Sequence, residues 1–156
     1  MKPIYSIEDV VPHAGTMSLL DDIVDTGKET LLARVNLNPD TLFAESKGVP
    51  AWIGIEYMAQ AVAAYAGVQA RDHGDPVRIG FLVGSRRYLC SHSYFPLGES
   101  LEVSVHKELQ ADNGLGVFHC AIRCGEVTAS ASLNVFQPED AEEFLQDERN
   151  KEQTRD

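Results

Sequence analysis

The sequence predicts an α+β fold in which an antiparallel β-sheet wraps around one long central helix. Three observations lead to this prediction. Residues 51–71 are apolar on almost every side of a helix, several later segments alternate apolar with polar residues, and short turns separate those segments. Strands that follow one another through tight turns pair antiparallel, because a parallel pair needs a long crossover.

Each expected element has a local signal. Residues 30–37 alternate with a period of two and end at Asn38-Pro39-Asp40, and an irregular loop follows over 41–49. Pro50 suits the start of the helix. The polar, Gly-containing stretch 71–76 is expected to end it. Further strands are expected at 78–83, 101–109, 117–123 and 127–135.

Length and charge limit the classes of function. The chain has 156 residues and a net charge of −11, which repels phosphate backbones and argues against a nucleic-acid partner. It shows neither a membrane span nor a secretory signal, so a cytoplasmic protein is expected. The expected domain covers residues 1–137. Residues 138–156 form an acidic C-terminal tail with eight acidic and three basic residues.

Glu56 is the most informative single residue. It lies near the start of the most apolar helix, with Gln60 one turn further along the same face. A carboxylate in such surroundings costs free energy unless it is paired or neutral, and burial would raise its pKa toward general acid or base work. A structural carboxylate that caps the helix or pairs with an arginine is the alternative.

Four segments together resemble the hot-dog-fold β-hydroxyacyl-ACP dehydratases, and most closely the dehydratase-like subfamily of aryl-polyene gene clusters. Pro50 with Gly54-Ile55-Glu56-Tyr57-Met58-Ala59-Gln60-Ala61 is similar to the central helix of that family. Residues 11–21, 81–86 and 96–101 are similar to three other signatures of the family. The resemblance spans roughly residues 8–136.

The resemblance implies a hot-dog fold and a paired assembly, either a homodimer or a heterodimer with a homologous subunit. It also implies elimination of water from a 3-hydroxyacyl group carried on the phosphopantetheine of an acyl carrier protein. No other cofactor and no metal is expected. Glu56 would be the catalytic acid, and Trp52, Gln60, Gly84 and Arg86 would contact the substrate. Arg86, with Arg78 and Arg87, forms a basic cluster suited to an acidic carrier.

One position departs from the family. Fourteen residues before Glu56, where the family has its catalytic histidine, this chain has Leu42. His13 could replace that base, or the chain could lend Glu56 to a homologous partner that retains the histidine. It could also be a non-catalytic acyl-binding subunit, or a thioesterase in which Glu56 activates water. Whether the chain is itself an enzyme therefore stays open.

Overall fold

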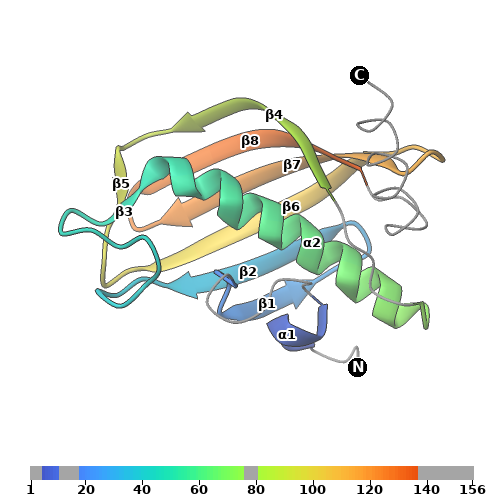
Figure 1. The fold of residues 1–156 in the computed structure, drawn as a ribbon, viewed down its shortest axis with the longest axis horizontal. Helices are drawn as coiled ribbons and strands as arrows, with labels where there is room; N and C mark the ends of the chain where they lie inside the picture. The colour runs from blue at the N-terminus through green and yellow to red at the C-terminus, as the bar shows by residue number, and fades with distance from the viewer. Residues whose placement is uncertain (1–4, 11–17, 76–80, 137–156) are drawn as a thin grey trace, which may run out of the picture.

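The computed structural model describes residues 5–10, 18–75 and 81–136, and its main feature is a six-stranded sheet crossed by one long helix (Figure 1). The strands lie in the order β1-β2-β6-β7-β8-β4, and every neighbouring pair is antiparallel. A second, two-stranded sheet pairs β3 with β5. The elements are α1 (Ile7–Val10), β1 (Asp22–Thr26), β2 (Thr30–Asn36), β3 (Val49–Pro50), the 3₁₀ turn η2 (Ala51–Ile53), α2 (Gly54–Asp72), β4 (Phe81–Cys90), β5 (Tyr94–Phe95), β6 (Ser100–Gln110), β7 (Leu115–Cys124) and β8 (Val127–Phe136).

The predicted architecture is confirmed. The expected helix over 51–71 becomes η2 followed by α2, and β2, β6, β7 and β8 match their predictions within two residues at each end. The strand expected at 78–83 instead runs from 81 to 90, and β1, β3 and β5 were not predicted. These missed strands have two to five residues, which is too short for a period of two to be recognised.

The core lies between the sheet and α2. Along β6, exposed and buried residues alternate, with Leu101, Val103 and Val105 facing inward. From the helix, Tyr57, Met58 and Ala61 meet this face and are fully buried. The alternation seen in the sequence thus corresponds to one face packed against the helix and one face in solvent.

The second half of α2 is fixed by contacts at its side. The Tyr65 hydroxyl donates a hydrogen bond to the Lys28 carbonyl oxygen (2.8 Å), in the turn between β1 and β2. At Gly67 the helix touches α1 so closely that a Cβ there would collide with the backbone of Val10. No helix in the described part of the chain is long and apolar enough to cross a membrane. The acidic tail lies outside the described residues.

Candidate active site at the first turn of α2

The start of α2 is held by β-structure on both sides of it in the sequence. Pro50 pairs with Tyr94, and the Ala51 N–H donates to the Ser93 carbonyl oxygen (2.9 Å). The Tyr88 hydroxyl, from β4, donates to the Ala51 carbonyl oxygen. A Cβ on Gly54 would collide with this hydroxyl, so glycine is what allows β4 to approach the helix.

Glu56 lies on the outer side of α2 and is exposed in the single chain. This corrects the expectation that the carboxylate is sequestered among apolar groups. The reason is the helical period: Tyr57 and Met58 take the positions that face the sheet, which leaves Glu56 on the other side. Among the residues that the structure describes, none shields this carboxylate from water.

Gln60 links Glu56 to the N-terminal part of the chain. Its side chain is 1% exposed. Its Nε2 donates to Glu56 Oε1 (3.3 Å), and its Oε1 accepts the Leu19 N–H (2.8 Å). The orienting role expected for Gln60 therefore has a geometric basis, whereas its predicted contact with substrate stays a prediction. His13 lies outside the described residues, so its predicted role as a base also stays a prediction.

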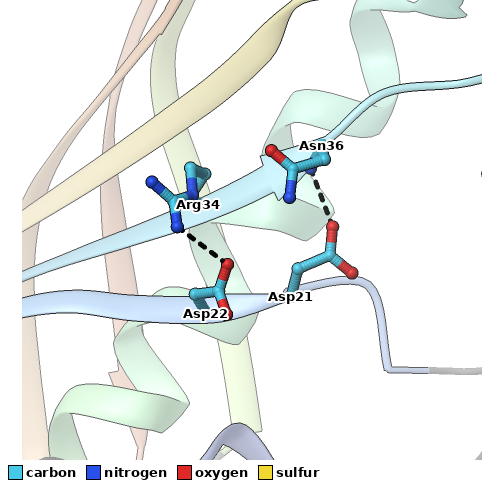
Figure 2. Close-up of polar contacts among 4 residues, drawn as sticks. All are labelled: Asp21, Asp22, Arg34 and Asn36. Atoms are coloured by element: carbon cyan, nitrogen blue, oxygen red, sulfur yellow. Dashed lines mark hydrogen bonds and ion pairs between the residues drawn. The ribbon is translucent and has the colours of Figure 1, made fainter.

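The segment that Gln60 binds is fixed on its other side by β2 (Figure 2). Asp21 Oδ2 accepts the Asn36 N–H at 2.7 Å, and Asp22 forms an ion pair with Arg34 at 3.1 Å. Asp21 ends the segment 11–21, which resembles a family signature but for which the sequence suggests no physical role. The structure gives Asp21 a physical role, because its carboxylate fixes the chain two residues after Leu19, whose N–H binds Gln60.

Three exposed apolar residues in the loop before α2 and in η2, which we call the Phe43 patch, are Leu42, Phe43 and Trp52. Trp52 is 67% exposed, and its ring centroid lies 6.3 Å from that of Phe43. Trp52 precedes Glu56 by four residues, about one helical turn. Phe43 has a φ of 70°, unusual for a residue with a Cβ. Leu42, at the position of the family's histidine, is 36% exposed.

The remaining predicted site residues lie on the edge strand β4. Gly84 is half-buried, with open space around it, and Arg86 is exposed and opposite Ser132 on β8. Within the described residues, no hydrogen bond or ion pair joins either of them to Glu56. The sequence analysis missed Tyr88, although Gly54 in an otherwise bulky helix start is the signal that a neighbour approaches closely there.

The described histidines and cysteines do not form a second site. His73 and His92 bond within their own turns, and His106 and His119 face each other on the outer side of the sheet. Within 5–10, 18–75 and 81–136, no group of three His, Cys, Asp or Glu could hold a metal ion. The three cysteines, at positions 90, 120 and 124, are free. Burial raises the pKa of Cys120 to about 12, which leaves it protonated at neutral pH.

Solved structures similar to this one share its hot-dog fold. A chain of the dehydratase heterocomplex ApeI:P from Xenorhabdus doucetiae superposes with a TM-score of 0.83 at 25% identity, covering 92% of this chain and 97% of that one. The E. coli PaaI protein from the phenylacetic acid degradation operon has a TM-score of 0.59 at 11% identity, covering 74% and 81%. A mutant hypothetical thioesterase from Streptococcus pneumoniae has a TM-score of 0.57 at 13% identity, covering 80% and 98%. The last two show the fold alone.

A search of curated proteins finds no match to the sequence. The family model for the ApeP dehydratase, however, matches residues 5–146, which is most of the chain. With the fold and the carboxylate at the start of the central helix, this match agrees with the resemblance first seen in the sequence. The chain is a dehydratase-like hot-dog protein and belongs to the ApeP-like dehydratase family.

Proposed function

We propose that this chain is one half of a two-subunit dehydratase that acts on 3-hydroxyacyl groups carried by an acyl carrier protein. The observation that carries the proposal is Glu56, an acid at the first turn of α2 that is oriented by Gln60 and open on the side away from the sheet. Leu42 stands where the family's base would be, and a leucine cannot accept a proton. The second catalytic group must then come from elsewhere.

The chemistry divides between two groups. A base removes the proton from the α-carbon, the electron pair of that C–H bond forms the new double bond, and the β-carbon–oxygen bond breaks. Glu56 in its protonated form donates its proton to the departing hydroxyl, which leaves as water. We assign the base to a homologous hot-dog subunit, and His13 is the alternative within this chain.

Two exposed features support a protein partner over this region. The Phe43 patch includes Trp52, which precedes Glu56 by four residues, and Leu89, 68% exposed, lies near the end of the edge strand β4. Large apolar side chains and an open sheet edge in solvent favour association. The similarity to a chain of the ApeI:P heterocomplex favours a homologous subunit as this partner.

The carrier protein is proposed from charge. Arg86 and Arg87 are adjacent and exposed on β4 in a chain whose net charge is −11. Guanidinium groups form charge-assisted hydrogen bonds with carboxylates and phosphates, and both occur on an acidic carrier with its phosphopantetheine arm. The predicted cytoplasmic location agrees with a role in acyl synthesis and stays a prediction. No observation beyond the shared fold favours the thioesterase alternative.

The test is an assay of the purified chain on a 3-hydroxyacyl-carrier substrate, alone and with a homologous hot-dog protein that retains the histidine. Mass spectrometry of the carrier separates loss of water, expected here, from release of the free thiol, expected of a thioesterase. We expect turnover only with both subunits. In that complex Glu56→Gln should lower kcat at least about a hundredfold.

Glu45→Gln is the matched control, because Glu45 is an exposed carboxylate in the loop before the helix. It should leave turnover within about twofold. Full activity of the chain alone would overturn the half-site proposal and favour His13. Unchanged turnover of the Glu56→Gln complex would remove Glu56 from the mechanism.

A further inference from the structure

The edge strand β4 contains an irregular step beside the start of α2. Arg86 pairs with Ser132 and Leu89 pairs with Ser130, so β4 uses one residue more than β8 between these pairs. Arg87, within this step, has a φ of 55°. The left-handed region is unfavourable for a residue with a Cβ, and bulges of this kind redirect side chains next to functional sites.

The result of the extra residue is the direction of Tyr88. Its neighbours Arg87 and Leu89 are exposed, whereas Tyr88 is half-buried and its hydroxyl donates to the Ala51 carbonyl oxygen. Burial, with a smaller contribution from Cys90, raises the pKa of Tyr88 well above its usual value. The hydroxyl therefore keeps its proton and remains a donor throughout the neutral range.

Ala51 is thereby held by three hydrogen bonds. Its N–H donates to the Ser93 carbonyl oxygen (2.9 Å), and its carbonyl oxygen accepts both the Tyr88 hydroxyl and the Gly54 N–H. These contacts fix the turn from which α2 begins. Glu56 follows Gly54 by two residues, so a movement of this turn moves the Glu56 carboxylate as well.

We infer that Tyr88 is a positioning residue, which acts through Ala51 and Gly54 to place the Glu56 carboxylate for proton donation. The catalytic consequence rests on the proposed function, whereas the placement of Glu56 does not. Tyr88 has no described contact with Glu56 itself. Its effect on the acid therefore runs through the backbone of Ala51 and Gly54.

The experiment compares Tyr88→Phe with Tyr65→Phe in the full chain. Both substitutions remove one hydroxyl that hydrogen-bonds a backbone carbonyl, but Tyr65 lies in the second half of α2 and bonds Lys28. The first readout is the NMR resonance of the Gln60 side-chain amide, whose Nε2 lies 3.3 Å from Glu56 Oε1. It should shift in Tyr88→Phe and stay in place in Tyr65→Phe. Thermal unfolding shows that each variant is folded.

The second readout is the kinetics of the two-subunit complex. Tyr88→Phe should lower kcat about tenfold and leave KM within about twofold, and Tyr65→Phe should change neither. An unmoved Gln60 resonance in Tyr88→Phe overturns the inference. A moved resonance with unchanged kcat also overturns it, because Tyr88 would then be structural only. If the wild-type complex has no activity, the proposed function fails and the Gln60 resonance alone decides whether Tyr88 places Glu56.

Discussion

Replacing Gln60 with leucine should cost more stability than the same change at Gln69, the other glutamine of α2. Gln60 is 1% exposed and accepts the Leu19 N–H, so leucine leaves that N–H buried without this acceptor. An orphaned buried donor costs about 1–3 kcal/mol, and loss of the long hydrogen bond to Glu56 adds about 0.5–1 kcal/mol. The two costs sum to about 1.5–4 kcal/mol, and the gain from burying leucine reduces this to an expected net loss of about 1–3 kcal/mol.

The assay is urea unfolding followed by circular dichroism. With a slope near the middle of the usual range of about 1–3 kcal/mol per molar urea, this loss lowers the midpoint by roughly 0.5–1.5 M. Gln69→Leu is the matched control on the same helix, because Gln69 is half-buried and its hydrogen bond to the Gly27 carbonyl oxygen (3.2 Å) can be replaced by water. It should cost less than about 1 kcal/mol. Equal costs for the two variants would refute the reasoning that Gln60 links residue 19 to the helix.

Two further predictions concern packing and buried thiols. Gly54→Ala should destabilise the fold by about 1–3 kcal/mol, because its Cβ would collide with the Tyr88 hydroxyl, whereas Gly84→Ala, with nothing within 4 Å of its Cβ, should change the unfolding free energy by less than about 0.5 kcal/mol; equal effects in chemical denaturation would contradict the close approach. The pKa of Cys120 is raised from 9.0 to about 12 by burial, so the folded state keeps a proton that the unfolded state loses, and stability should fall as the pH rises from 9 to 12. Relative to Cys120→Ala, this extra loss should reach up to about 4 kcal/mol, and parallel pH profiles of the two proteins would contradict it.

Much of the fold could be predicted from the sequence because buried residues recur at the regular spacing of a strand or a helix. The alternation over 101–109 and 127–135 and the apolar run over 51–71 directly gave the strands β6 and β8 and the helix α2. The short strands β1, β3 and β5 were missed because their positions come from pairing with distant segments and not from a pattern of their own.

The candidate site could be predicted from the sequence only in part. The carboxylate of Glu56 and its neighbour Gln60 were found from helical spacing, and their hydrogen bond is present. The burial expected for Glu56 was wrong for the single chain. An apolar composition shows that a helix is covered by other structure, but it does not show which side of the helix packs against the sheet. Tyr88 was missed because its relation to Ala51 spans 37 positions along the chain.

The sequence alone determined the class of fold, the family and the acid at the start of the central helix, since spacing and composition are local properties that a chain carries before it folds. Tertiary structure decided which side of α2 faces the sheet, that Leu19 meets Gln60, and that an extra residue in β4 brings Tyr88 against the first turn of the helix. These depend on the register between strands and on close approach at Gly54, which no single segment specifies.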